Sequence, residues 1–251
     1  MRRILALCLA GTALAAAAAN AAEIRVLTAG AFKPVVAALV PEFERQFGHK
    51  VIVDNDTAGA LARRISGGEA FDLVVLTADG IAGLAKSGKV VADTSTPLAK
   101  VGIGVAVKAG APLPDIGTVA AFRAALLNAR AVAYIDPKAG GSSGIYLAQW
   151  FEKAGIAAEI KAKSVLVPGG LTAARVVNGE ADIAVQQISE LLVVPGATYV
   201  GPIPAEIQNW TVYSGAVSAT ARNATAARTL LAALNGPDAQ AVLKAKGMAT
   251  P

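Results

Sequence analysis

The fold is decided by three short runs rich in β-branched residues, IRVLTA (24–29), VIVDN (51–55) and LVVLT (73–77). Alanine-rich stretches with apolar residues at helical spacing follow these runs, at 33–47, 58–66 and 79–87. Short strands that alternate with helices are typical of a parallel sheet covered by helices on both faces. We therefore predict an α/β fold for this part of the chain.

The same alternation returns in the second half of the chain. Strands are predicted at VAYID (132–136), SVLV (164–167) and DIAVQ (182–186), and helices at 143–154 and 170–178. Two separate series of strands and helices are most simply explained by two similar α/β lobes, each a doubly wound sheet.

Extended segments at 101–107 and 207–217 connect the two series. Two crossings between the lobes imply that the C-terminal helices, predicted at 222–234 and 237–246, return to the first lobe. We therefore predict two doubly wound lobes joined by two crossing strands. The predicted bounds are 23–103 plus 208–251 for lobe 1 and 104–207 for lobe 2.

The N-terminal segment has the features of a bacterial secretory signal peptide. Arg2 and Arg3 form a positive start, residues 4–18 are apolar, and Ala19-Asn20-Ala21 provides small residues for cleavage. The apolar run is shorter than the ~20 residues that a membrane-spanning helix needs. We predict that residues 1–22 are a signal peptide and that the protein is periplasmic.

Loss of that segment changes the composition of the chain. Residues 1–22 contain two of the 23 basic side chains, none of the 18 acidic ones and the only cysteine, Cys8, so the formal net charge falls from +5 to +3. A scattered excess of this size does not form the basic face that nucleic acids bind. With His49 as the only histidine, a metal site is not expected either. We predict no metal, cofactor or nucleic-acid partner.

Three strand-to-helix junctions carry the residues expected to bind a ligand: LTAGAFKP (27–34), NDTAGALARRI (55–65) and DPKAGGSSGIY (136–146). Open α/β sheets bind their ligands at the carboxyl ends of strands. The unpaired N–H groups at a helix start attract an anion, and small residues let the anion approach them. Thr57, Ser142 and Ser143 are also common N-cap residues. Three such junctions divided between two lobes favour a shared anion-binding cleft.

The segment GGSSG (140–144) also matches the nucleophile elbow of α/β-hydrolases. That fold needs a histidine after the nucleophile, whereas His49 lies far upstream. The glycines are not followed by the GK[ST] of a phosphate-binding P-loop. Hydrolase and nucleotide-binding functions are therefore disfavoured.

Two segments carry a resemblance to a known family: AGALARRISGGEAFDLVVLTAD (58–79) and DPKAGGSSGIYLAQWFEKAGI (136–156). They resemble, in matching order, segments of the periplasmic molybdate-binding-protein-like family of ABC importer solute-binding proteins, which includes aconitate isomerase-like members. The resemblance covers nearly the whole chain after residue 22. It implies a class II periplasmic binding fold that closes two lobes on a ligand. It also implies a monomer that works with ABC importer permease subunits.

Transfer of the family's binding positions implies a site with altered hydrogen-bond donors. The oxyanion-binding serines of the family fall at Ala31 and in the Thr57-Ala58 pair, and its binding tyrosine aligns with Gln187. A site that loses hydroxyl donors discriminates against its original ligand, so we expect a small organic carboxylate in preference to molybdate. Arg175 is a further candidate for a positive charge. The predicted ligand-binding residues are Gly30, Ala31, Lys33, Thr57, Ala58, Thr77, Ala78, Ser142, Ser143, Gly144 and Gln187.

Two functions remain open on this basis. The first is a binding protein that captures a small anion for an ABC importer. The alternative is a cofactor-independent isomerase of the aconitate type, which moves a double bond by proton transfer and needs a positioned acid or base. The candidates for that role are Lys33, Asp136, Tyr146 and Glu190. A third function, a structural module of the cell envelope, leaves the three helix-start junctions unexplained.

Overall fold

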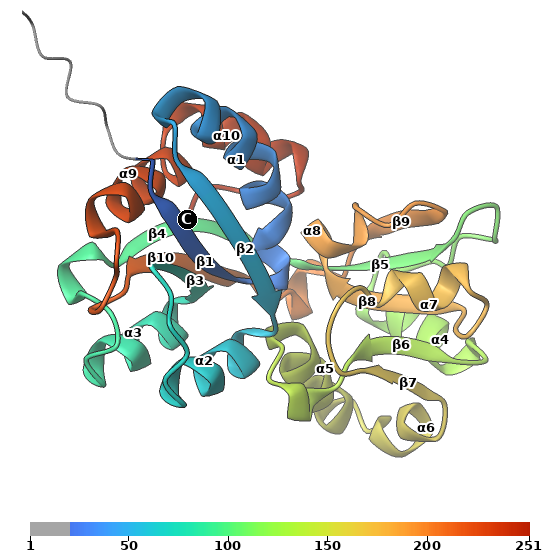
Figure 1. Ribbon diagram of the computed structural model, residues 1–251. Helices are drawn as coiled ribbons and strands as arrows, with labels where there is room; N and C mark the ends of the chain where they lie inside the picture. The colour runs from blue at the N-terminus through green and yellow to red at the C-terminus, as the bar shows by residue number, and fades with distance from the viewer. Residues whose placement is uncertain (1–20) are drawn as a thin grey trace, which may run out of the picture.

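The computed structural model describes residues 21–251. The predicted signal peptide up to Asn20, with Cys8, lies outside the described residues. The described chain forms two five-stranded sheets, each in a lobe of its own, and the lobes lie side by side (Figure 1). No helix of this part is long and apolar enough to cross a membrane.

The first lobe is built on a sheet of strands from both ends of the chain. The strand order is β2 (Lys50–Asp56), β1 (Glu23–Ala29), β3 (Leu73–Thr77), β10 (Thr211–Val217) and β4 (Thr96–Val101). Strand β1 is parallel to β2 and β3, whereas β10 is antiparallel to both β3 and β4. The C-terminal part of the chain therefore supplies the fourth strand of the first sheet.

The second lobe repeats this plan. Its strand order is β7 (Ser164–Val167), β6 (Val132–Ile135), β8 (Ile183–Gln187), β5 (Ile103–Lys108) and β9 (Ala197–Pro202). Strand β6 is parallel to β7 and β8, and β5 is antiparallel to β8 and β9. Because the three parallel strands of each sheet end at the same edge, their carboxyl ends present the helix starts together.

Helices cover both faces of each sheet, as expected for strands that are apolar on both sides. In the first lobe α1 (Lys33–Phe47), α9 (Ala224–Leu234) and α10 (Pro237–Ala245) lie on one face, and α2 (Ala58–Ser66) and α3 (Ala78–Lys86) on the other (Figure 1). In the second lobe α4 (Val119–Asn128), α5 (Ser142–Lys153) and α6 (Ala157–Ala162) pack on one face, and α7 (Ala173–Val177) and α8 (Ile188–Leu191) on the other.

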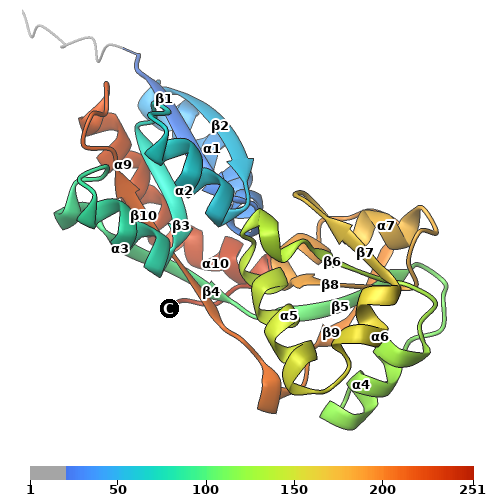
Figure 2. The same ribbon diagram turned by 90° about the horizontal axis from the view of Figure 1, so that it is seen from below.

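Two segments cross between the lobes, and Figure 2 shows both. Strand β4 continues through Gly102 into β5, and the short 3-10 helix η4 (Ala205–Ile207) lies between β9 and β10. The predicted fold class is thus confirmed: two α/β lobes are joined by two crossing segments. The lobe bounds 23–103 plus 208–251 and 104–207 stay a prediction.

The core of each lobe follows from the same apolar patterning. Side chains of the first sheet such as Leu27 and Leu73 are fully buried with Phe32 and Leu230 of the flanking helices. In the second lobe Phe122, Trp150 and Phe151 pack ring against ring on the α4–α5 face. The other face holds mainly alanine and valine, which brings α7 close to the sheet.

Candidate functional site

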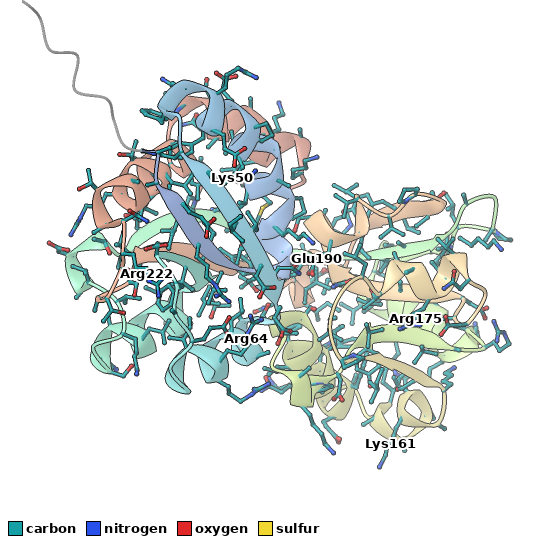
Figure 3. All side chains as sticks on the ribbon, in the orientation of Figure 1. Lys50, Arg64, Lys161, Arg175, Glu190 and Arg222 are labelled. Carbon is teal, nitrogen blue, oxygen red and sulfur yellow. The ribbon has the colours of Figure 1, made fainter. Side chains whose placement is uncertain are left out.

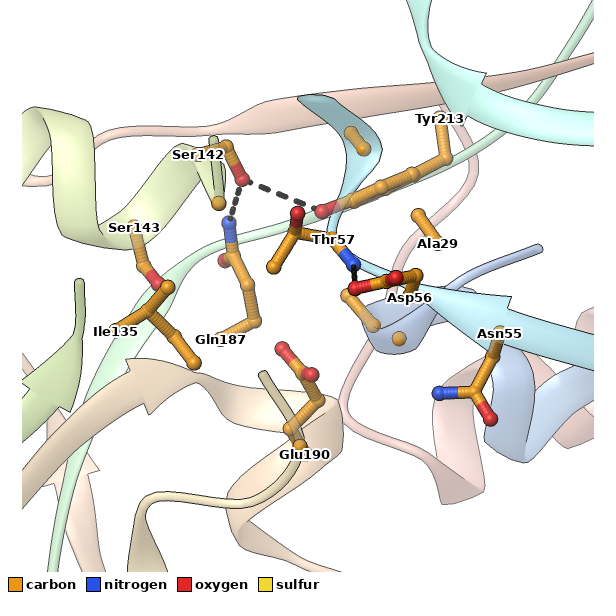
Figure 4. Close-up of a pocket in the computed structure, with 15 residues that line it drawn as sticks. Ala29, Asn55, Asp56, Thr57, Ile135, Ser142, Ser143, Gln187, Glu190 and Tyr213 are labelled. Atoms are coloured by element: carbon orange, nitrogen blue, oxygen red, sulfur yellow. Dashed lines mark hydrogen bonds between the residues drawn. The ribbon is translucent and has the colours of Figure 1, made fainter. Parts of the chain in front are cut away.

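A small pocket lies between the lobes, at the carboxyl ends of β1, β2, β6 and β8 (Figure 4). Its free volume is about 30 Å³, which is room for about two water molecules. Seven of the predicted ligand-binding residues line it: Gly30, Ala31, Thr57, Ala58, Ser142, Ser143 and Gln187. The other lining residues are Ala29, Asn55, Asp56, Ile135, Gly141, Gly170, Glu190 and Tyr213.

Direct contacts between the lobes keep this pocket closed. The Gly59 N–H donates to the Gly140 carbonyl at 3.0 Å, and the Ser189 hydroxyl donates to the Ala31 carbonyl at 2.7 Å. A Cβ atom on Gly59 would lie only 2.8 Å from the Cα of Gly140. The structure is therefore a closed form, in which glycine is required where the two backbones meet.

The second junction begins α2 with Thr57 as a true N-cap. Its Oγ1 accepts from the Ala60 N–H at 3.1 Å and donates its single proton to the Ala139 carbonyl of the other lobe at 2.5 Å. Asp56 accepts from the Thr57 N–H at 2.7 Å. The hydroxyl proton of Thr57 is already donated to the Ala139 carbonyl across the cleft. Thr57 therefore stabilises the closed form and does not offer a free donor to a ligand in the pocket.

The third junction begins α5 with Ser142 and Ser143 directly after Gly141. No side chain caps this helix start, and the first N–H groups of a helix have no acceptor within it. The predicted residue Gly144 is absent from the pocket lining. A Cβ there would lie 2.1 Å from the Ile135 carbonyl oxygen, so Gly144 lets α5 pack closely on β6.

Gln187 links three polar groups at the back of the pocket. Its Nε2 donates to the Ser142 hydroxyl at 2.9 Å and to the Thr211 hydroxyl at 3.0 Å, while Tyr213 shares a 3.3 Å hydrogen bond with Ser142. Its Oε1 is buried without a hydrogen-bond partner among the described residues. Because both hydroxyls can donate as well as accept, a rotated amide keeps both bonds and turns its unpartnered atom into a donor.

Glu190 is the one buried titratable carboxyl among the residues that line the pocket. It lies on α8, its exposed fraction is 8%, and Figures 3 and 4 show it where the lobes meet. Burial raises the pKa of Glu190 to about 8, although the nearby Gln186 amide opposes the shift. A Cβ on Gly30 would lie 2.6 Å from Glu190 Oε1, so the backbone of the first junction approaches the carboxyl directly.

Tyr213 faces the same space from the first lobe. Burial, followed by the charge of Glu190, raises the pKa of Tyr213 well above its ordinary value, so its hydroxyl keeps its proton. The lining residues include Asp56 and Glu190 but neither lysine nor arginine. Arg64 lies 3.7 Å from Asp56 and also forms ion pairs with Asp54 and Glu69. These carboxylates balance its positive charge.

Several predicted site residues lie outside the pocket. Thr77 and Ala78 line a neighbouring cavity with Tyr146 and Trp210, and Lys33 lines another on the far side of Glu190. The Tyr146 hydroxyl donates to the Ile207 carbonyl, and burial raises the pKa of Tyr146.

Two further candidates have structural partners elsewhere. Asp136 accepts from the Lys138 N–H and caps the 3-10 helix η3 (Pro137–Ala139). Arg175 pairs with Glu180 on the second lobe, away from the pocket (Figure 3). Of the four candidates for proton transfer, Glu190 is thus the one that lines the pocket.

Several residues that line the pocket were not predicted from the sequence, among them Tyr213, Asn55, Asp56 and Gly170. Asn55 and Asp56 belong to the second junction, so the same strand-end argument could have included them. Tyr213 could not be found in this way, because it lies on a strand that enters the first sheet from the far end of the chain.

A closed pocket between two α/β lobes, with helix starts from both lobes around it, defines a two-lobed solute-binding protein. The chain belongs to the bacterial extracellular solute-binding protein family, whose model matches residues 24–249. The resemblance stated from the sequence is thereby confirmed.

Comparisons with known proteins give relatives of two kinds. Aconitate isomerase of Pseudomonas sp is 34% identical over 249 residues, which cover 97% of this chain and 93% of that protein. The periplasmic molybdate-binding protein of Azotobacter vinelandii is 19% identical, with a TM-score of 0.77 over 91% of this chain and 99% of that one. The sulfate-binding protein SubI of Mycobacterium tuberculosis is 21% identical, with a TM-score of 0.71 over 90% and 86%. The two solved structures show the shared fold.

Proposed function

We propose that the protein binds a small unsaturated polycarboxylate between its lobes and moves the double bond by proton transfer at Glu190. The observation that carries this proposal is a buried carboxyl with a raised pKa in an interlobe pocket. A carboxyl group with a pKa near 8 exists in both protonation states around neutral pH, as a group that accepts and returns a proton requires. An isomerase needs such a group. The 34% identity with an aconitate isomerase supports aconitate as the first substrate to test.

The chemistry requires one group that first accepts and then returns a proton. Ionised Glu190 removes a proton from the CH2 carbon, and the C–H electron pair forms a new double bond conjugated with a carboxylate. The electrons of the original double bond move to its carbon farther from the former CH2 group, and that carbon takes the proton from Glu190. One C–H bond is broken and one is formed, so no oxidant or reductant is needed. A pKa near the working pH suits both halves of this transfer.

The negative charge that develops on the substrate needs stabilisation in the pocket. The N–H groups of Ser142 and Ser143 open α5, and the positive end of a helix dipole favours an anion. The hydroxyls of Ser142 and Tyr213 lie beside them. These groups support binding of a carboxylate whose charge increases as the proton leaves.

An ultraviolet assay of cis–trans aconitate interconversion tests the proposal. We expect turnover by the wild type and a loss of about 10²–10⁴-fold in the Glu190→Gln variant. The exposed Glu159 gives a matched control, since Glu159→Gln should leave the rate unchanged. A wild-type protein that binds aconitate in calorimetry without interconverting it contradicts the isomerase proposal.

The second candidate function is capture of a carboxylate for an ABC importer, with the permease subunits as partners of a periplasmic monomer. The shared fold and the closure contacts Gly59–Gly140 and Ser189–Ala31 support it. Tight binding of di- or tricarboxylates without turnover is the expected result for this function. Low-micromolar binding of molybdate or sulfate would contradict the preference for a carboxylate.

A further inference from the structure

A second and larger cavity adjoins the pocket behind Glu190. It shares the lining residues Gly30, Asn55, Gly170 and Glu190 with the pocket, and its free volume is about 440 Å³. The pocket itself has about 30 Å³. The smaller space accommodates one carboxyl end of a ligand but not a six-carbon tricarboxylate, so the remainder of such a ligand must extend into a neighbouring space.

The second cavity carries the positive charge that the pocket lacks. Lys33, the first residue of α1, and Lys246, directly after α10, both line it. Neither lysine belongs to an ion pair within residues 21–251. Two lysines, of which Lys33 is exposed and Lys246 partly buried, therefore line a cavity that also reaches Glu190.

The cavity on the other side of the pocket differs in charge. It adjoins the pocket at Ser142 and is lined by Asp79, Tyr146 and Trp210, with no lysine or arginine among its lining residues. A polyanion that emerges from the pocket is therefore attracted toward the lysine side. The charge distribution gives the ligand a single favoured direction.

The position of Lys246 is fixed by contacts between the lobes. The backbone of the next residue, Gly247, lies against α8, where an added Cβ would be 2.6 Å from Ile188 and 2.8 Å from Leu192. Helix α8 also carries Glu190. In the closed form, the turn with Lys246 therefore has a defined position relative to the buried carboxyl.

We propose that this second cavity is a carboxylate subsite in which Lys33 and Lys246 select ligands with further carboxylates beyond the one in the pocket. Lys33 is a ligand-binding residue predicted from the sequence, whereas Lys246 was not predicted. The substrate class rests on the proposed function. The existence of the subsite is measured by binding alone, so the two can fail separately.

Calorimetric titration of propane-1,2,3-tricarboxylate and of glutarate tests the subsite, because these saturated acids bind without isomerising. We expect Lys33→Gln and Lys246→Gln each to weaken tricarboxylate binding by about three- to fivefold, and the double variant by about tenfold or more. Glutarate lacks the central carboxylate, so its affinity should fall less in these variants, and the preference for the tricarboxylate over glutarate should become smaller. The Lys33→Arg variant keeps the positive charge and should retain the wild-type preference.

Lys244→Gln is the matched control, since Lys244 is exposed in the last turn of α10, two residues before Lys246, and it should leave both affinities unchanged. Unchanged affinities in the double variant, or a wild type that binds no tricarboxylate, overturn the subsite. If aconitate is turned over while the double variant keeps its KM, the subsite fails and the isomerase stands. If binding shows the expected pattern without turnover, the isomerase fails and the subsite stands.

Discussion

Replacement of Glu190 by glutamine should stabilise the folded protein above pH 5. Burial raises the pKa of Glu190 from 4.5 to about 8, so between these values the folded state holds a proton that the unfolded state has released. The free energy of unfolding therefore falls as pH rises through this window. At about 1.4 kcal/mol per pH unit, the wild type loses about 3 kcal/mol between pH 5 and pH 7.5 on account of this one group. Glutamine has no proton to lose and avoids this penalty.

Urea unfolding at pH 5, 6, 7 and 7.5 measures the difference between Glu190→Gln and the wild type. We expect the variant's advantage to grow by about 3 kcal/mol over this range, with unchanged m-values. Other groups titrate alike in both proteins and cancel, including Glu69, whose pKa is lowered by hydrogen bonding to Arg64. Glu159→Gln, at an exposed site, should show no such growth. If the difference in free energy of unfolding between the variant and the wild type stays constant with pH, Glu190 does not have a raised pKa in the folded protein.

Three further substitutions and one binding measurement test the site. Gly30→Ala places a Cβ 2.6 Å from Glu190 Oε1 and should lower kcat in the ultraviolet assay by about tenfold or more with little change in Tm. Gly59→Ala should prevent closure against Gly140, so that small-angle scattering shows no compaction with ligand. Tyr213→Phe removes the bond to Ser142 and should weaken ligand binding in calorimetry by about three- to tenfold. Anion binding at pH 8 should be accompanied by uptake of as much as about half a proton at Glu190. Calorimetry in buffers of different ionisation enthalpy should show this uptake as a buffer-dependent heat, which the Glu190→Gln variant should lack.

The sequence predicts the fold well because periodicity reports each strand and helix locally. The helix starts at Thr57 and Ser142 line the pocket, as expected for junctions at the carboxyl ends of parallel strands. The predicted helix 170–178 begins only at Ala173, because Gln186 binds the Thr172 N–H and the Gly170 carbonyl and holds the preceding residues as a loop. Hydrogen bonds of this kind depend on tertiary structure and leave no local pattern.

The third strand end shows why the remaining site residues could not be predicted. Tyr213 pairs with Thr77 across the β3–β10 ladder, so the last strand of the chain brings its hydroxyl to Ser142 at this edge. Thr77 instead caps α3 through the Gly80 N–H at 3.2 Å and lines the neighbouring cavity with Ala78. Strand β9 was also missed, since Gly201 and Pro202 interrupt its pattern, and both are tolerated because β9 is an edge strand.

The charge balance of the closed cleft explains how a pocket with two acids and no cation can hold an anion. Asp56 lies near Arg64, and Glu190 is mostly protonated at neutral pH because burial raises its pKa to about 8. The pocket is therefore close to neutral before the proposed carboxylate binds, and we propose that the start of α5 and the lysines beyond Glu190 provide the attraction. Once Glu190 ionises, the same pocket holds two adjacent negative charges, which raises the energy of the bound state and favours return of a proton. Under the proposed function, the buried carboxyl of Glu190 is the group that lets this pocket transfer a proton as well as bind an anion.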